Sequence, residues 1–271
     1  MDPLPGHARA RLAEPAAIDL LASIASRAGL LLDFDGTLAP IQSDPSAVRP
    51  LPGVVEALAA LVGRLGRVAV VSARPAAFLR ACFGSVDGIA LHGHYGLQAV
   101  TPEGIEVTVP AALPWISVLD EVAHRARHEL PAAVLIEQHP LSVSLHYRTA
   151  LHLQAAVGAW AGDQARRVGV AAQRGRMVVE LRPPIERDKG DVVTEETRGL
   201  AVAWYAGDDI SDLRAFRALA EREAREPGFV GVRVAVTNEE TGHELAEAAD
   251  FMVATPAAVP GLLCRLLNAL G

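Results

Sequence analysis

The sequence contains few aromatic residues, few cysteines and no excess of positive charge. Phenylalanine, tyrosine and tryptophan make up 4% of the 271 residues, so aliphatic side chains must fill most of the core. The two cysteines, Cys82 and Cys264, lie far apart and form no CxxC pair, which favours buried free thiols over a metal or redox site. A formal net charge of −7 argues against a nucleic-acid or anionic-membrane partner.

Long hydrophobic runs are also absent. No stretch reaches about 18 uninterrupted apolar residues, so we expect no transmembrane helix. The beginning of the chain carries Asp2 and Glu14 among short apolar patches, so we expect no secretory signal. A content of 51% hydrophobic and 21% charged residues is typical of a globular protein, and we predict a cytoplasmic one.

The most informative stretch is residues 30–38, Leu-Leu-Leu-Asp-Phe-Asp-Gly-Thr-Leu. Three consecutive leucines are typical of a strand that is buried on both faces, as in parallel sheets. Asp33 and Asp35 should point the same way along an extended backbone, because side-chain direction repeats every two residues. Two like charges at the end of an apolar strand are costly unless a cation or a reacting group uses them.

Strand and helix patterns alternate in the first and last parts of the chain. Alternation of this kind predicts a doubly wound parallel sheet with right-handed crossovers. Between residues 107 and 185 the predicted order is instead αββαββ, which we interpret as an inserted α+β domain. The predicted domains are therefore a core in two parts, 1–106 and 186–271, and an insert, 107–185. Core strands are predicted at 30–32, 68–71, 89–92, 201–206, 229–236 and 251–254.

Polar groups follow the predicted core strands or precede the helix at 189–200. Because the carboxyl ends of parallel strands lie side by side, these groups should meet at one edge of the sheet. Singly, each has an ordinary structural explanation, such as a turn serine or an acidic helix start. Together they supply a nucleophile, an acid or base, a hydroxyl, a cation and oxygen ligands for Mg²⁺, as phosphoryl transfer requires. The residues are Asp33, Asp35, Ser72, Lys189, Asp208, Asp209 and Asp212.

The motifs resemble those of a known family. Residues 33–41, Asp-Phe-Asp-Gly-Thr-Leu-Ala-Pro-Ile, resemble the first motif of haloacid-dehalogenase-type phosphatases, and the Ala-Pro-Ile ending is similar to the trehalose-6-phosphate phosphatase branch. Residues 72–74 resemble its Ser-Gly-Arg with Ala for Gly, 179–190 its third motif, and 207–212 its fourth. Leu213 replaces an acidic residue that often follows the fourth motif. The resemblance implies a Rossmann-like haloacid dehalogenase core with the insert as a cap that closes over the sugar.

The resemblance also implies roles for the core residues. Asp33 would attack phosphorus and form an aspartyl-phosphate, and Asp35 would protonate the leaving sugar oxygen and then act as base on water. Ser72 and Lys189 would bind phosphoryl oxygens. The expected Mg²⁺ ligands are the Asp33 carboxylate, the Asp35 carbonyl and Asp208, with Asp209 or Asp212 acting through water.

Substrate contacts are expected from both parts of the chain. In Ile-Glu-Gln-His, Glu137 matches the first residue of a Glu-Asp-Lys pattern in the family, and His139 stands where the lysine is expected. Glu180 matches a second cap carboxylate, and carboxylates can accept hydrogen bonds from several sugar hydroxyls. In the core, the N–H groups of Gly36 and Thr37 should face an anion. The residues expected to bind the substrate are Gly36, Thr37, Arg74, Glu137, His139, Glu180 and Arg182.

The function so implied is Mg²⁺-dependent hydrolysis of trehalose 6-phosphate to trehalose and phosphate, by a monomer with a small-molecule partner. One alternative is a phosphatase for another sugar phosphate, such as sucrose phosphate or mannosyl-phosphoglycerate. A second alternative is a catalytically idle protein that binds a sugar phosphate. The complete set of catalytic residues argues against this last alternative, because a protein that only binds has no need of the acid/base Asp35.

Overall fold

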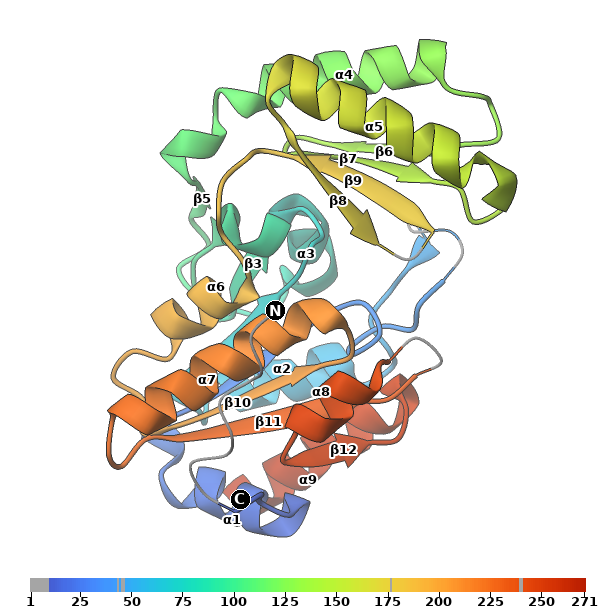
Figure 1. The fold of residues 1–271 in the computed structure, drawn as a ribbon. Helices are drawn as coiled ribbons and strands as arrows, with labels where there is room; N and C mark the ends of the chain where they lie inside the picture. The colour runs from blue at the N-terminus through green and yellow to red at the C-terminus, as the bar shows by residue number, and fades with distance from the viewer. Residues whose placement is uncertain (1–9, 43, 45–46, 176, 239–240) are drawn as a thin grey trace. The chain divides into compact units, whose positions relative to one another are not determined.

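The computed structural model describes residues 10–42, 44, 47–175, 177–238 and 241–271. The chain folds as two compact units (Figure 1). The core unit contains the described residues of Met1–Val107 and Arg187–Gly271, and the insert is Thr108–Glu186. Each unit has its own sheet and its own hydrophobic core.

The core unit is built on an eight-stranded sheet with the order β12-β11-β10-β1-β2-β3-β4-β5 among the described residues. The strand at the centre, β1 (Ala28–Leu32), pairs in parallel with β10 (Val202–Gly207) and β2 (Arg67–Val71). The parallel sheet predicted from the sequence is therefore confirmed around its first strand, which lies in the middle, whereas the strand at residues 98–100 runs antiparallel to its neighbour at 90–93. The other strands are β3 (Ala90–Gly93), β4 (Gln98–Val100), β5 (Glu106–Thr108), β11 (Val230–Val236) and β12 (Phe251–Val253).

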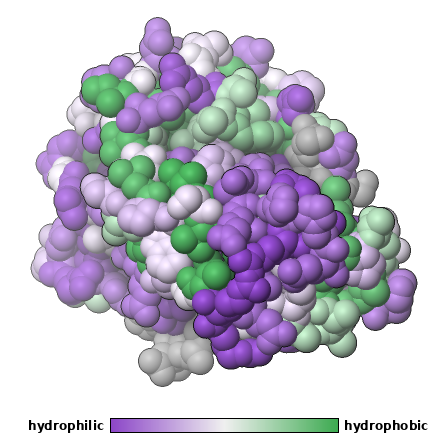
Figure 2. Space-filling model, turned by 90° about the horizontal axis from the view of Figure 1, so that it is seen from above, coloured by the Kyte–Doolittle hydropathy of each residue, from purple (hydrophilic) through white to green (hydrophobic). Residues whose placement is uncertain are grey.

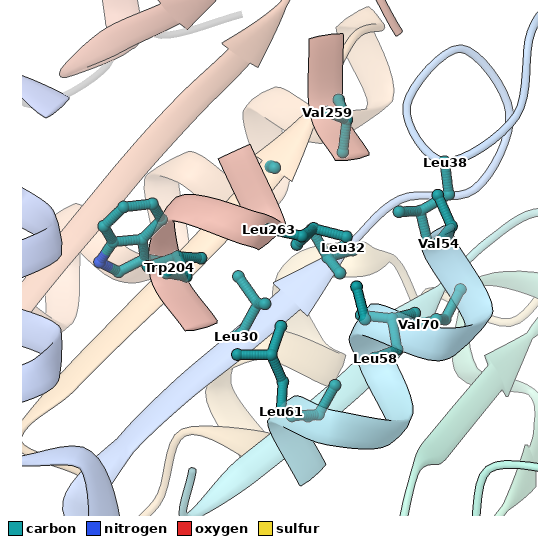
Figure 3. Packing of buried hydrophobic residues seen from close by; sticks show 14 of the residues in the cluster. Leu30, Leu32, Leu38, Val54, Leu58, Leu61, Val70, Trp204, Val259 and Leu263 are labelled. Atoms are coloured by element: carbon teal, nitrogen blue, oxygen red, sulfur yellow. The ribbon is translucent and has the colours of Figure 1, made fainter. Parts of the chain in front are cut away.

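Helices cover both faces of this sheet, which explains the run of leucines in β1. Leu30 and Leu32 point to one face, where they pack with residues of α2 and α9 (Figure 3). Leu31 points to the other face and packs with residues of α6 and α7. Full burial of each leucine contributes about 1.5–3 kcal/mol. The first face carries α1 (Glu14–Ser23), α2 (Val54–Val62), α3 (Ala76–Phe83) and α9 (Val259–Leu270), and the second carries α6 (Lys189–Glu196), α7 (Leu213–Arg225) and α8 (His243–Ala248).

The insert has a four-stranded antiparallel sheet with the order β6-β7-β9-β8. Apolar side chains of one sheet face, such as Val143 and Leu181, pack against α4 and α5. Because side-chain direction alternates along a strand, the polar residues between them lie on the other face. The element order is the αββαββ order predicted from the sequence, with bounds α4 (Trp115–Glu129), β6 (Leu135–His139), β7 (Ser142–His146), α5 (Gln154–Val168), β8 (Ala171–Gly175) and β9 (Val178–Arg182).

The surface carries hydrophobic side chains only in small groups on the face that Figure 2 shows, among wide hydrophilic areas. Within the described part of the chain, no helix has both the length and the apolar character needed to cross a membrane.

Candidate active site

Asp33 follows directly on β1 and is 4% exposed. Its backbone N–H donates to the carbonyl of Ala206 at 2.9 Å, so the β1–β10 ladder extends to the residue itself. Its carboxylate oxygen Oδ1 lies 2.8 Å from Nζ of Lys189. Burial raises the pKa of Asp33 well above its usual range; Lys189 opposes the shift, whereas Asp212 and Asp208 add to it.

Lys189 begins α6 and is 3% exposed. Its helix start is fixed by Asp188, whose side chain accepts the N–H groups of Gly190 and Asp191. The ammonium bridges Asp33 at 2.8 Å and Asp212 at 2.6 Å. Burial alone would lower the pKa of Lys189, but the two carboxylates hold it well above its usual range, so the lysine is a fixed cation.

Asp212 lies in the loop after β10 and is fully buried. Its side chain accepts hydrogen bonds from four donors. Its Oδ1 accepts hydrogen bonds from Lys189 Nζ at 2.6 Å and from the Tyr205 hydroxyl at 2.7 Å. Its Oδ2 accepts the backbone N–H groups of Asp208 and Asp209, both at 3.0 Å. These contacts fix the loop and the lysine together.

Asp208 has the carboxylate best suited to an ion. Its Oδ2 accepts a hydrogen bond from Asn238 Nδ2 at 2.6 Å, whereas its Oδ1 is buried and has no hydrogen-bond partner among the residues described. Burial raises the pKa of Asp208 to about 7; Asp212 adds to the shift and Asn238 opposes it. Asp33, Asp208 and Asp212 each offer an oxygen within 4.8 Å of the others. One lysine faces three buried carboxylates, and such a set of oxygens could also hold a cation.

Glycine is required at two positions beside the buried carboxylates, Gly36 in the loop after β1 and Gly207 at the end of β10. Gly36 has φ = +74°, and a Cβ atom there would lie 2.1 Å from Oδ2 of Asp208. A Cβ atom at Gly207 would lie 2.2 Å from Cγ of Asp212. Both loops can therefore approach the carboxylates only with glycine at these positions.

The amides of the turn after Asp35 have partners inside the turn. The N–H of Gly36 donates to Ala39 at 2.8 Å and that of Thr37 to Phe34 at 3.3 Å. A role for these N–H groups toward an anion stays a prediction. The hydroxyl of Thr37 is the donor that remains, since it is buried without a hydrogen-bond partner in the described part of the chain.

Two side-chain contacts join Asp35 and Arg74. Arg74 Nε donates to Oδ2 of Asp35 at 2.9 Å, and Nη2 donates to Oδ1 at 2.7 Å. Ser72, which follows β2 and is 1% exposed, accepts the backbone N–H of Arg74 on Oγ at 3.1 Å. The ends of β1 and β2 are thus tied together by side chains, as their common edge predicts.

The insert's polar sheet face gathers the other predicted residues. Glu137 Oε1 lies 3.0 Å from Nε2 of His139, and its Oε2 lies 3.0 Å from Nε2 of His146. Burial raises the pKa of Glu180, and Arg182 and His139 oppose the shift. Two carboxylates and several nitrogen donors on one face can bind a polyhydroxylated ligand.

Residues 31–250 match the family model for trehalose-phosphatase. The chain belongs to this family. A trehalose-phosphate phosphatase of Mycobacterium marinum is 34% identical over 254 residues, which cover 90% of this chain and 62% of that protein. The one from Mycolicibacterium paratuberculosis is 36% identical over 255 residues, covering 89% and 62%. The chain thus spans less than two thirds of the length of these relatives.

Solved structures agree on the fold of this trehalose-phosphatase family member. The crystal structure of a trehalose-6-phosphate phosphatase related protein matches with TM-score 0.74 and 24% identity, covering 89% of this chain and 97% of that one. The Candida albicans trehalose-6-phosphate phosphatase C-terminal domain matches with TM-score 0.76 and 22% identity, covering 97% and 99%. A haloacid dehalogenase-like hydrolase from Bacteroides thetaiotaomicron matches at 0.59 and 16%, covering 88% and 97%. The predicted haloacid dehalogenase-like fold is confirmed.

Three residues of this trehalose-phosphatase family chain were missed from the sequence. Tyr205 lies two residues before Gly207, and a polar tip in a buried strand was a usable signal. Asn238 follows β11, so the strand-end rule applied to it as well. His146 shares a face with Glu137 only through strand pairing. Asp209, in contrast, is exposed, and its side chain accepts the N–H of Ile210 at 2.6 Å.

Proposed function

We propose that the protein hydrolyses trehalose 6-phosphate to trehalose and phosphate through a phosphorylated Asp33. The observation that carries the proposal is the buried Asp33 carboxylate, which lies 2.8 Å from a lysine and within 4.8 Å of Asp208 and Asp212. A carboxylate in this setting is fixed in place and faces a permanent cation. Family membership supports a sugar phosphate as the substrate, and the acid/base candidate Asp35, two residues after Asp33, supports hydrolysis over binding alone.

The first half of the reaction would transfer the phosphoryl group to the protein. An oxygen of Asp33 attacks phosphorus, and the bond between phosphorus and the sugar oxygen breaks with its electron pair on that oxygen. The sugar oxygen takes a proton from the carboxyl group of Asp35 and leaves as the hydroxyl of trehalose. Lys189 offsets the charge on the phosphoryl oxygens, and the hydroxyls of Ser72 and Thr37 are available as donors.

The second half would return Asp33 to its starting state. The carboxylate of Asp35 takes a proton from water while the water oxygen attacks phosphorus. The bond between phosphorus and the Asp33 oxygen then breaks, with its electron pair on the carboxylate. The products are inorganic phosphate and the original pair of aspartates, with Asp35 protonated for the next turnover.

The donor set fits a magnesium ion. Asp208 Oδ1 is a buried carboxylate oxygen without a hydrogen-bond partner among the described residues, and hard oxygen ligands are those that Mg²⁺ prefers. Asp33, Asp208 and the carbonyl of Asp35 would hold the ion. When bound, it would offset the negative charge shared by the nucleophile and the phosphoryl group. Asp212 already accepts four hydrogen bonds, so we assign it a positioning role, with Asp209 as a candidate through water.

The insert would act as the cap domain and would bind the sugar. We propose that Glu137 and Glu180 accept hydrogen bonds from sugar hydroxyls, with His139 and Arg182 as donors beside them. His139 in place of the family's lysine keeps a nitrogen donor but shortens its reach. A cytoplasmic location and a monomeric state stay predictions.

A panel of phosphate esters tests the proposal. Trehalose 6-phosphate, sucrose phosphate, mannosyl-phosphoglycerate and glucose 6-phosphate would be compared by release of inorganic phosphate with added Mg²⁺. We expect the highest kcat/KM for trehalose 6-phosphate and no release after chelation of the metal. A higher kcat/KM for another sugar phosphate would make that ester, and not trehalose 6-phosphate, the substrate. Tight binding of the ester without release would indicate a binding protein.

A further inference from the structure

The contact between Arg74 and Asp35 assigns the arginine a different partner from the one predicted. Both carboxylate oxygens of Asp35 face the guanidinium, at 2.9 Å from Nε and 2.7 Å from Nη2. A fork of this kind fixes the position and also the plane of a carboxylate, which a single hydrogen bond cannot do. The sequence resemblance had placed Arg74 among the residues that bind the substrate.

Arg74 is itself held from several sides. Its guanidinium lies 4.8 Å from the ring centroid of Phe78, and that ring meets Phe34 edge-on at 5.5 Å. Its backbone N–H donates to Ser72 Oγ at 3.1 Å, and its carbonyl accepts the N–H of His94 at 2.9 Å. The side chain is 12% exposed. An arginine packed in this way is arranged before any ligand arrives.

We propose that Arg74 is a positioning residue for the two proton transfers of Asp35. The inference rests on the proposed function, because it needs Asp35 to act as acid and then as base. Proton transfer requires a carboxylate within hydrogen-bond reach of the leaving oxygen and then of the attacking water. Asp35 has a side chain that is 34% exposed, so without the fork it would be free to change rotamer. Arg74 limits that freedom.

Two substrates with different leaving groups can distinguish a positioning role of Arg74 from a role in phosphate binding. An alkyl leaving group such as trehalose must be protonated as it departs, whereas 4-nitrophenolate leaves as a stabilised anion. Loss of general-acid catalysis should therefore lower kcat/KM for the sugar phosphate far more than kcat/KM for 4-nitrophenyl phosphate, because kcat/KM reports only the steps up to transfer of the phosphoryl group to Asp33. Loss of a phosphate-binding group should lower kcat/KM for both substrates by the same factor, because both carry the same phosphoryl group.

The experiment measures kcat and KM for both substrates in the wild type, Arg74→Lys and Arg74→Gln. We expect kcat/KM for the sugar phosphate to fall about 100-fold in both variants, within the range of general acid–base catalysis. The value of kcat/KM for 4-nitrophenyl phosphate should fall only a few-fold, whereas kcat should fall for both substrates because they share the attack of water on the phosphorylated Asp33. Lysine keeps the charge but not the fork, so Arg74→Lys should fail to rescue. If Arg74→Gln does not fold, Arg74→Lys carries the test.

Arg222 provides a matched control. Its side chain is 11% exposed, it pairs with Glu226 at 2.9 Å, and it lies 4.0 Å from the centroid of the Phe229 ring. Arg222→Lys therefore removes a similar set of contacts at the end of α7, and we expect a similar loss of thermal stability. The ratio of the two kcat/KM values should stay at its wild-type value in this variant.

A double variant makes the test more specific. Asp35→Ala should itself slow the sugar phosphate selectively, and adding Arg74→Gln should then cause no further change in selectivity. Equal loss of kcat/KM on both substrates, with rescue by Arg74→Lys, would overturn the inference and restore phosphate binding. Absence of turnover by the wild type on every substrate would instead overturn the proposed function.

Discussion

The polar residues at the core edge and those on the insert's polar face are held in different ways. The side chains of Lys189 and Asp212 are 3% and 0% exposed, whereas those of Glu137 and His139 are 22% and 25% exposed. A buried ion pair cannot exchange partners without a large desolvation cost, while a partly exposed one exchanges readily with water or ligand hydroxyls. In the proposed function, the core edge would carry the chemistry and the insert would contribute to the affinity for the sugar.

The largest effect is expected from the nucleophile. Asp33→Asn keeps the size of the side chain and a hydrogen-bond acceptor for Lys189, but it removes the attacking carboxylate. We expect kcat to fall at least about 1,000-fold while the circular dichroism spectrum is unchanged. Retained phosphate release by the folded variant would remove Asp33 from its role.

The buried carboxylates should also make the metal-free protein less stable at high pH. Burial and Asp212 raise the pKa of Asp208 to about 7, so between its unfolded and folded pKa values the folded state binds the extra proton. This contribution is present at low pH, and it is lost as the pH rises from about 4 through 7. It amounts to at most about 4 kcal/mol.

Urea unfolding of the metal-free protein at pH 5 and pH 8 measures this effect. Other groups also titrate in this window, so the wild type should be compared with Asp208→Asn. We expect the variant to lose less stability between the two pH values, and Mg²⁺ to restore the wild type at pH 8. The same pH dependence in both proteins would contradict the assignment.

A smaller effect is expected from the hydroxyl of Tyr205. Tyr205→Phe keeps the edge-on contact with Phe216, at 6.2 Å between ring centroids, and removes only the hydrogen bond to Asp212. We expect a loss of about 1–2 kcal/mol in unfolding free energy. Because Asp212 also holds Lys189, kcat should fall about tenfold with KM unchanged. This corresponds to an increase of roughly 1.4 kcal/mol in the activation free energy.

Thr197 is the control for this substitution. It is fully buried at the end of α6, and its hydroxyl donates to the carbonyl of Val193 at 2.7 Å. Thr197→Val should cost a similar amount of stability but leave kcat unchanged. Equal kcat values for Tyr205→Phe and Thr197→Val would show that Tyr205 acts only on stability.

The smallest effect is expected on the insert. Glu137→Gln and His139→Lys alter a face that is partly solvated, so folding should be nearly unaffected. We expect Glu137→Gln to raise KM for the sugar phosphate several-fold with little change in kcat, and to leave 4-nitrophenyl phosphate unaffected. A fall in kcat for both substrates would break the division between chemistry and affinity.

Much of the core could be predicted from the sequence because local pattern and sheet rules decide it. The leucines before Asp33 indicate a doubly buried strand, and the edge rule then brings Asp208, which follows β10, to Asp33. The short strands β4 and β5 were not predicted, because three residues carry too little pattern. Short apolar runs of this length are ambiguous in any sequence.

The individual bonds of the site were harder to predict. The fork between Arg74 and Asp35 joins residues 39 positions apart, and nothing in either motif indicates that contact. The amide of Gly36 was predicted to face an anion. It donates to Ala39 in this structure, and that hydrogen bond depends on how the turn closes, which the motif does not indicate. Asn238 was missed because its only signal is its place after β11, which many turn residues share.

The central claim is that Asp33 carries the phosphoryl group during turnover. Rapid acid quench of the wild type with trehalose 6-phosphate labelled at phosphorus, followed by tryptic digestion, tests it directly. The label should appear on the peptide of residues 28–64, at Asp33, and should be released by hydroxylamine. Release of phosphate with no label on the protein, or label on another residue, would contradict the account.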